Sequence, residues 1–330
     1  MEDYKLNRRK KIISFVAIIM AFAIAVTGCS SSKNKATDSK ADEKKLKVVT
    51  TIFAPYDFAR QIGKEHADVT LLLKPGAESH SFEPTPQDII SIQNCDVFIY
   101  VGGENDSWVD KVLSSIDNKD MKIIKLLDCV DVVEEELKEG MQEEEHEHDH
   151  EEEEKEFDEH VWTAPKNVIT IATKMQQVFA ETDAEHAKDY EANLASYKEQ
   201  IDKLDKAFFD VVNNAKRKTL VFGDRFPLRY FVDQYKLEYF AAFPGCSTET
   251  DVSAATIAFL TDKVKEEKIP VIFKIELSND TIAKSIADAT GAKVMTFYSC
   301  HNISKDDYEK GLTYTDFMWR NVDALKEALN

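Results

Sequence analysis

The side chains best suited to metal chemistry gather in residues 143–160, which read EEEHEHDHEEEEKEFDEH. His146, His148 and His150 occupy every second position within a run of carboxylates, and the run ends at His160. Imidazoles spaced in this way on a mobile chain can converge on one divalent cation, and the carboxylates concentrate cations around them. The alternative interpretation is a solvated, disordered charge run without a ligand. We treat the first three histidines as candidates for auxiliary metal collection.

The N-terminus has the pattern of a lipoprotein signal peptide over residues 1–28. Five basic side chains precede an uncharged apolar run at residues 12–26, and the sequence VTGC places small residues before Cys29. The run is about 15 residues long, shorter than the roughly 20 that span a bilayer, which disfavours a retained transmembrane anchor. We expect cleavage before Cys29, a lipid on its thiol and a flexible tether over residues 29–46. The mature chain would then be anchored to the extracytoplasmic face of the cell membrane.

The charge of the chain is strongly negative and mostly local. Removing residues 1–28 removes five basic and two acidic side chains, which moves the formal charge from -19 to -22. Residues 134–159 hold sixteen acidic side chains and two lysines, a net charge of -14. This balance excludes nucleic acid as an expected partner. It also predicts a disordered acidic, His-rich loop over about residues 134–159.

The remainder of the chain alternates strand-like and helix-like segments. This alternation predicts an α/β protein in which mostly parallel sheets are covered by helices. The first half has expected strands at 47–52, 69–73, 96–101 and 122–126, with helices at 54–64, 85–93 and 107–115. The second half has expected strands at 219–222, 237–242, 271–275 and 293–298, with helices at 254–268 and 281–290.

Between these halves, residues 165–216 show no strand signal and are rich in Ala, Lys, Glu and Gln. A break at residues 182–183 leaves a helix of about 30 residues, too long for an ordinary crossover. We therefore predict an N-terminal lobe at 47–181, a long rigid linking helix within 182–216 and a C-terminal lobe at 217–330. Ligands of open parallel sheets bind beyond the carboxyl ends of the strands, so the loops at those ends are the expected site.

Two histidines follow strands of the first lobe. His80 lies in the loop KPGAESHSFEPTP after the strand at 69–73, and His160 follows the fourth strand. A single histidine is usually a satisfied polar residue. Because the ends of parallel strands meet at one edge of the sheet, these two imidazoles are expected on the same side, and we interpret them as metal ligands.

These loops carry a family resemblance. The segments TIFAPYDFARQIG, LLLKPGAESHSFEPTPQD, DVFIYVGGENDSWVDKV, the acidic His-rich insertion and DEHVWTAPKN follow one another in this order. Together they resemble the zinc- and manganese-binding substrate-binding proteins of ATP-binding-cassette importers, over essentially the whole mature chain. The resemblance implies two lobes bridged by a rigid helix, with one metal at their interface. His80 and His160 match the two ligand positions of the first lobe, and the insertion is typical of zinc-binding members.

The second lobe departs from this pattern after the strand TLVF. Zinc-binding members usually have a histidine there, whereas this chain continues Gly223-Asp224-Arg225. Glycine and arginine offer no ligand at neutral pH. Manganese-binding members place a carboxylate near this point, which makes Asp224 a candidate ligand. An N-cap for the following helix is an equally plausible role for Asp224.

The loop after the last strand supplies the other candidates. The family typically has an aspartate ligand there, and the natural replacement in this chain is His301. Glu249 and Glu276 also follow strands, and we rank both lower. Cys246 and Cys300 are expected at the same sheet edge, where a disulfide between them would shape the loop; a zinc thiolate from one of them is the alternative.

Three imidazoles with one carboxylate suit four-coordinate Zn²⁺ better than Mn²⁺, which prefers more oxygen donors. We therefore expect a monomeric, non-enzymatic receptor that captures Zn²⁺ and delivers it to separately encoded permease and ATPase subunits. A manganese receptor is the closest alternative. An exported zinc hydrolase with Glu276 or Glu249 as base, or a surface adhesin or metal buffer in which only the acidic run binds metal, are further alternatives.

Overall fold

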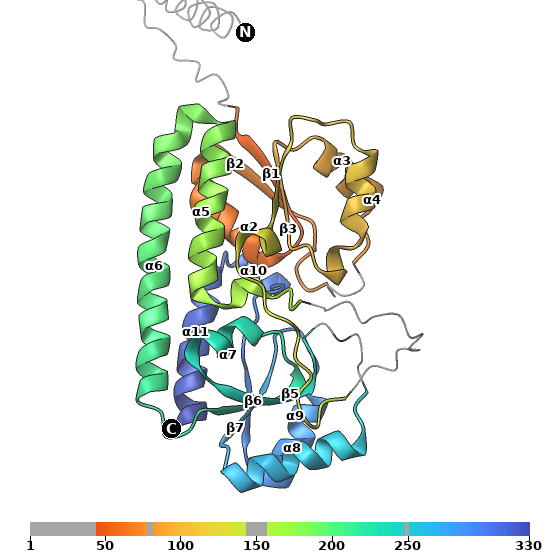
Figure 1. Ribbon diagram of the computed structural model, residues 1–330, viewed down its shortest axis with the longest axis vertical. Helices are drawn as coiled ribbons and strands as arrows, with labels where there is room; N and C mark the ends of the chain where they lie inside the picture. The colour runs from red at the N-terminus through yellow and green to blue at the C-terminus, as the bar shows by residue number, and fades with distance from the viewer. Residues whose placement is uncertain (1–43, 78–81, 143–156, 246, 248–250) are drawn as a thin grey trace, which may run out of the picture. The chain divides into compact units, whose positions relative to one another are not determined.

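The computed structural model describes residues 44–77, 82–142, 157–245, 247 and 251–330 (Figure 1). Lys44–Asn330 forms one compact unit. Several predictions concern residues outside these ranges and stay predictions: the signal peptide, the tether and the positions Cys29, His80, His146, His148, His150, Cys246 and Glu249. In the ranges given above, no helix has both the length and the apolar character needed to cross a membrane.

The first sheet consists of four parallel strands in the order β2-β1-β3-β4. Its central strand β3 reads VFIY and is buried at every position, as expected for a parallel strand covered on both faces. Helix α3 begins at a capping box between Thr85 and Asp88, with proline at its first position. The elements of this lobe are β1 (Leu46–Thr50), α2 (Phe53–Gly63), β2 (Ala67–Leu71), α3 (Pro86–Gln93), β3 (Val97–Tyr100), α4 (Trp108–Ser115) and β4 (Lys122–Lys125).

The second sheet repeats this arrangement, with four parallel strands in the order β6-β5-β7-β8. The predicted fold class is therefore confirmed, and the strand and helix ranges agree with the predicted ranges to within a few residues. The elements are β5 (Thr219–Arg225), α7 (Arg229–Tyr235), β6 (Glu238–Phe243), α8 (Ala254–Glu267), β7 (Val271–Lys274), α9 (Thr281–Thr290) and β8 (Lys293–Thr296).

The linking region contains two helices, α5 (Pro165–Thr182) and the 27-residue α6 (Ala187–Asn213). The predicted break at 182–183 and the long helix are both present. Helix α6 packs against α2 of the first lobe and α7 of the second, and Figure 1 shows it running alongside both lobes. Two helices that sequence reasoning missed complete the chain, α10 (Lys305–Glu309) and α11 (Tyr314–Leu329), and α11 packs on α6.

Part of the acidic insertion differs from its prediction. Residues 134–142, which we call the arm, were expected to be disordered, but they lie along the second lobe. Glu136 contacts Arg229 at 3.4 Å, and the Lys138 ammonium lies 5.2 Å from the ring centroid of Tyr239. The prediction of disorder was wrong for residues 134–142, because their acidic composition does not reveal that they contact cationic and aromatic side chains of the second lobe.

The far end of the arm is fixed to β6 and α8. The backbone N–H of Gln142 donates to the Ala242 carbonyl at 2.9 Å, and the Gln142 side-chain oxygen accepts from the Ser253 N–H at 3.1 Å. At the other end, Glu134 pairs with Phe157 in an antiparallel bridge. The arm therefore attaches the insertion to the second lobe, in addition to its covalent connection to the first.

A buried carboxyl group joins helices α2 and α11. Asp57 is fully buried, and its carboxylate accepts from the Tyr314 N–H at 3.0 Å and from the Gln61 amide at 3.3 Å. Tyr314 is the first residue of α11, so Asp57 satisfies one of the N–H groups that a helix start leaves without an intrahelical partner. Burial raises the pKa of Asp57 from 3.8 to about 6.

We expect this carboxyl to make folding stability depend on pH. Between about pH 4 and pH 6 the folded state keeps a proton that the unfolded state has lost, so the free energy of unfolding falls as pH rises through this window. Asp57→Asn should remove that contribution, which is of the order of 2–3 kcal/mol for a shift of about two pKa units. Urea denaturation of both proteins from pH 4.5 to 7.5 measures it.

The control is Asp323→Asn, because the Asp323 side chain is 77% exposed. It should follow the pH profile of the parent. If Asp57→Asn and the parent gave parallel profiles across this pH range, the raised pKa of Asp57 would be refuted.

Candidate metal site

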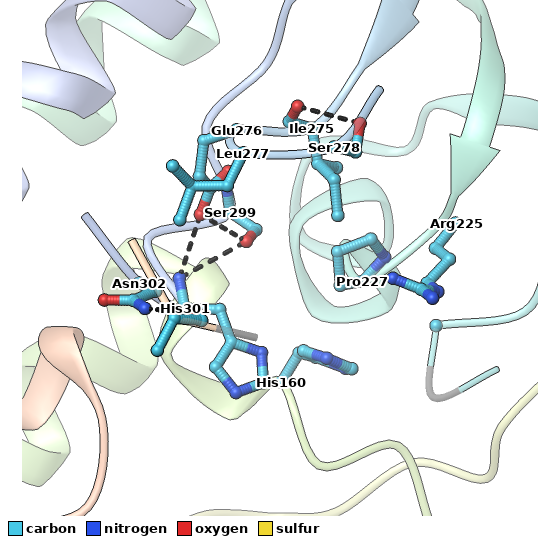
Figure 2. A pocket seen from close by; sticks show the side chains of 12 residues that line it. His160, Arg225, Pro227, Ile275, Glu276, Leu277, Ser278, Ser299, His301 and Asn302 are labelled. Atoms are coloured by element: carbon cyan, nitrogen blue, oxygen red, sulfur yellow. Dashed lines mark hydrogen bonds between the residues drawn. The ribbon is translucent and has the colours of Figure 1, made fainter. Parts of the chain in front are cut away.

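The carboxyl ends of the strands in both lobes meet around a cavity of about 50 Å³ (Figure 2). His160 and His301 line it, the first following the acidic insertion and the second following β8. Their ring centroids are 5.6 Å apart and the rings are nearly perpendicular. Two predicted ligands from different lobes therefore face the same space.

His160 is oriented by Asp158. The Asp158 carboxylate accepts from the His160 backbone N–H at 2.8 Å and lies 3.2 Å from the ring Nδ1. When Nδ1 carries the proton, Nε2 presents a lone pair, and this Nε2 atom is buried without a hydrogen-bond partner among the described residues. A carboxylate that orients the second nitrogen of a histidine is typical of metal-binding imidazoles. Burial lowers the pKa of His160, but the carboxylates of Asp158, Glu159 and Glu135 together raise it by more, so the net pKa lies above the ordinary value.

His301 is held by the loop after β7. The Glu276 carboxylate accepts from the backbone N–H groups of Ser299 at 2.7 Å and His301 at 3.1 Å, and from the Ser299 hydroxyl at 2.7 Å. Cys300 between them has a φ of 60°, a left-handed conformation that is costly for a residue with a side chain. The three hydrogen bonds to Glu276 stabilise this conformation and hold the backbone that carries His301.

Trp162 connects the two histidines and the two lobes. It is fully buried, and its ring centroid lies 5.3 Å from each of the His160 and His301 rings. Its indole N–H donates to the Ser299 carbonyl at 2.8 Å. Sequence reasoning missed this residue, although it stands within the DEHVWTAP segment that carried the resemblance.

The third predicted imidazole, His80, lies outside the described residues, but the chain that leads to it is fixed at the cavity. Ala77 lines the cavity. The Asn302 side-chain amide donates to the carbonyl of Lys74 at 3.1 Å and to that of Ala77 at 2.7 Å. Asn302 is adjacent to His301, so the start of the His80 loop is hydrogen-bonded to the loop that carries the second-lobe imidazole.

The two candidate carboxylates among the described residues, Asp224 and Glu276, occupy different environments. Asp224 is buried outside the residues that line the cavity. Its oxygens accept from the backbone N–H groups of Arg225 at 2.8 Å and Ile275 at 2.9 Å, and from the Ser278 hydroxyl. Glu276 does line the cavity. Burial raises the pKa of both carboxyl groups, and their hydrogen bonds partly offset it. Both carboxylates therefore act to hold loops in the structure.

The structure describes one of the two cysteines of the predicted disulfide. Cys300 is buried and forms no disulfide with another described cysteine, and burial raises the pKa of its thiol well above the ordinary value. Its expected partner, Cys246, lies outside the described residues, so the disulfide stays a prediction.

The described donors make up part of a metal site. In the part of the chain that the structure covers, no group of three or more His, Cys, Asp or Glu side chains is arranged to hold a metal ion. Two neutral imidazoles suit Zn²⁺, which is generally four-coordinate in proteins. Further donors would have to come from segments beyond the described residues or from outside the chain.

A family model described as zinc-uptake complex component A, periplasmic (ZnuA), matches residues 48–328. The chain belongs to this family. Among ZnuA relatives, the high-affinity zinc uptake system protein ZnuA of Bacillus subtilis is 33% identical over 315 residues, covering 94% of this chain and 96% of the relative. The zinc-binding lipoprotein AdcA of Streptococcus pneumoniae is 31% identical over 94% of this chain, which spans 60% of AdcA.

Solved structures agree with the ZnuA assignment. The Zn(II)-bound ZnuA-like domain of Streptococcus pneumoniae AdcA superposes with a TM-score of 0.71 at 29% identity, over 87% of this chain and 99% of that domain. The lipoprotein YcdH of Bacillus subtilis gives the same TM-score of 0.71 at 29% identity, over 86% of this chain and 99% of its own. The family resemblance and the two-lobed fold expected from the sequence are thus confirmed.

Proposed function

We propose that this chain is the extracytoplasmic receptor of a metal importer: it captures Zn²⁺ between its lobes and delivers it to a membrane permease driven by a separate ATPase. The observation that carries the proposal is the buried His160 Nε2, which has no hydrogen-bond partner among the described residues and shares a cavity with His301. The zinc-related names and the Zn(II)-bound structure of the relatives support zinc as the metal.

The ligands we propose are His80, His160 and His301. His160 and His301 are fixed by Asp158 and Glu276 respectively. His80 is added because its loop begins at cavity-lining Ala77. Asp224 and Glu276 serve as positioning residues, since their oxygens are engaged by loop N–H and hydroxyl groups.

The shared core limits how the receptor releases its metal. A single apolar cluster includes residues of both sheets and of α6, so wide opening would expose a large buried area. We infer small shifts of the loops around the cavity, in which His301 and the His80 loop move together through Asn302. The chain performs no covalent chemistry in this proposal, and it acts as a monomer held to the membrane through a lipid on Cys29.

Deletion of the histidine-rich part of the insertion distinguishes the receptor hypothesis from the metal-buffer hypothesis. We expect the mature chain lacking residues 143–156 to retain one tight Zn²⁺, because His160 belongs to the folded cavity while His146, His148 and His150 are removed. Calorimetric titration with Zn²⁺ and with Mn²⁺ measures stoichiometry and preference, with the undeleted mature chain as control. If the undeleted chain had only several weak sites and the deleted chain bound no zinc, the proposal would be contradicted. Tighter binding of Mn²⁺ than of Zn²⁺ would identify manganese as the metal of the receptor.

A further inference from the structure

An arginine lines the metal cavity. Arg225 is the last residue of β5, and the pairing of β5 with β6 changes register between Phe222 and Arg225. Such an irregularity redirects the side chains that follow it. Arg225 contributes to the same cavity wall as His160 and Gly245, and Figure 2 shows its side chain directed into that space. A permanent cation thus lies in a cavity that is proposed to receive Zn²⁺.

The Arg225 guanidinium has no ion pair or hydrogen bond with a described side chain or carbonyl, and its Nε is buried without a partner. The adjacent Asp224 does not neutralise it by direct contact, because the Asp224 oxygens accept from the Arg225 backbone N–H, Ile275 and Ser278. Guanidinium groups in partly buried places normally bind a carboxylate or another oxyanion through two parallel N–H groups. An anion would therefore be a suitable partner for Arg225.

The charge of a loaded cavity leads to the same conclusion. The charged side chains among the described cavity residues are Arg225 and Glu276, and the Glu276 carboxylate already accepts three hydrogen bonds. Imidazoles bind metal in their neutral form. Zn²⁺ held by imidazoles beside Arg225 would place positive charges close together in a partly buried site, which is energetically costly. An anion bound to both groups removes this cost.

The cavity has room for such a ligand. Its volume of about 50 Å³ exceeds the roughly 10–15 Å³ that holds one water molecule. Gly245 keeps it open, because a Cβ atom there would lie 3.2 Å from Cε1 of His160. Zinc held by three imidazoles also has a fourth coordination position for a small ligand.

We propose that Arg225 forms an anion subsite beside the metal, so that the chain binds Zn²⁺ together with a small planar oxyanion, a carboxylate or carbonate. One oxygen of the anion would ligate Zn²⁺, and another would accept from the guanidinium. This inference rests on the proposed zinc function and adds a second component to the cargo. It also assigns a role to a residue of the segment in which a histidine ligand was expected.

The test is zinc affinity with and without the anion. The mature chain is titrated with Zn²⁺ against a chromogenic chelator in carboxylate-free buffer depleted of carbon dioxide, and again with added bicarbonate or acetate. We expect either anion to raise the affinity of the parent about tenfold, the gain of one charge-assisted contact. Arg225→Gln should lose this gain, while Arg225→Lys, which keeps the charge without the planar fork, should keep part of it. Arg320→Gln is the matched control, because Arg320 stacks on Tyr298 and Phe317 away from the cavity.

A spectroscopic readout accompanies the titration. The visible absorption of Co²⁺ in place of Zn²⁺ should change on addition of the anion in the parent and not in Arg225→Gln. A response to bicarbonate alone identifies carbonate as the ligand, a response to acetate alone identifies a carboxylate, and the expected response to both shows that the subsite accepts either planar oxyanion.

Two results would overturn the subsite: a zinc affinity of the parent that is independent of both anions, or an anion effect of equal size in Arg225→Gln. In the first case, an anion response that appears after Glu249→Gln would identify the chain's own carboxylate as the partner of Arg225. The zinc affinity of His160→Ala tests the zinc site independently of the anion subsite. If that variant bound zinc as tightly as the parent, the proposed function itself would fail.

Discussion

Replacement of His160 by alanine is expected to lower the zinc affinity of the mature chain by at least about 100-fold. Loss of a residue that only orients a ligand commonly costs 10–100-fold, and loss of the ligand itself costs more. His160 supplies a buried Nε2 without another partner, and Asp158 holds its ring in place. His301→Ala should have an effect of similar size, because His301 is the described donor from the other lobe. Competition with a chromogenic chelator measures both variants.

The matched control is His66→Ala. His66 is a partly buried histidine whose ring stacks on His186 at 3.9 Å, and it is not among the residues that line the cavity. It should bind zinc as the parent does. Unchanged affinity in His301→Ala would show that the second-lobe ligand is a different residue, and unchanged affinity in both cavity variants would reject the site.

Trp162→Ala is expected to destabilise the fold by about 3–5 kcal/mol, the usual cost of removing a large buried aromatic side chain. The variant loses the contacts of a fully buried indole and leaves the Ser299 carbonyl without its donor. Because Trp162 lies between His160 and His301, the defect falls where the lobes meet. Urea denaturation of the metal-free protein measures the change in the free energy of unfolding.

Trp319→Ala provides the comparison, since Trp319 is 43% exposed on α11. We expect that variant to lie within about 1 kcal/mol of the parent, as is usual for surface substitutions. Equal losses in the two tryptophan variants would mean that Trp162 contributes no more than a surface residue, against the packing described above.

The resemblance to known metal receptors came from loop motifs, and the structure adds what those loops contact. Asn302 binds the backbone that leads to His80, and Trp162 binds the loop that precedes His301. Each lobe therefore holds part of the other lobe's proposed ligand loop. The proposed metal cavity depends on contact between the lobes as well as on the individual donors.

Secondary structure followed closely from the sequence because its causes are local. The apolar runs of β3 and β7 and the capping box at the start of α3 are set by residues within one element. Helix α11 has the same kind of local signal, a capping box between Thr313 and Asp316, and could have been predicted. The arm could not, because its partners Arg229, Tyr239 and Ala242 lie about 90–100 residues further along the chain.

The sequence by itself determined the two α/β lobes, the long linking helix and the histidines placed after strands, because hydrophobic periodicity and strand ends depend on residues that are close together in the sequence. The tertiary structure decided which polar atoms meet. It placed His160 against His301, engaged Asp224 in holding a loop, and left the Arg225 guanidinium facing the cavity without a partner among the described residues. Such pairings depend on how elements far apart in the chain pack together, and a linear pattern of residue types does not contain that information.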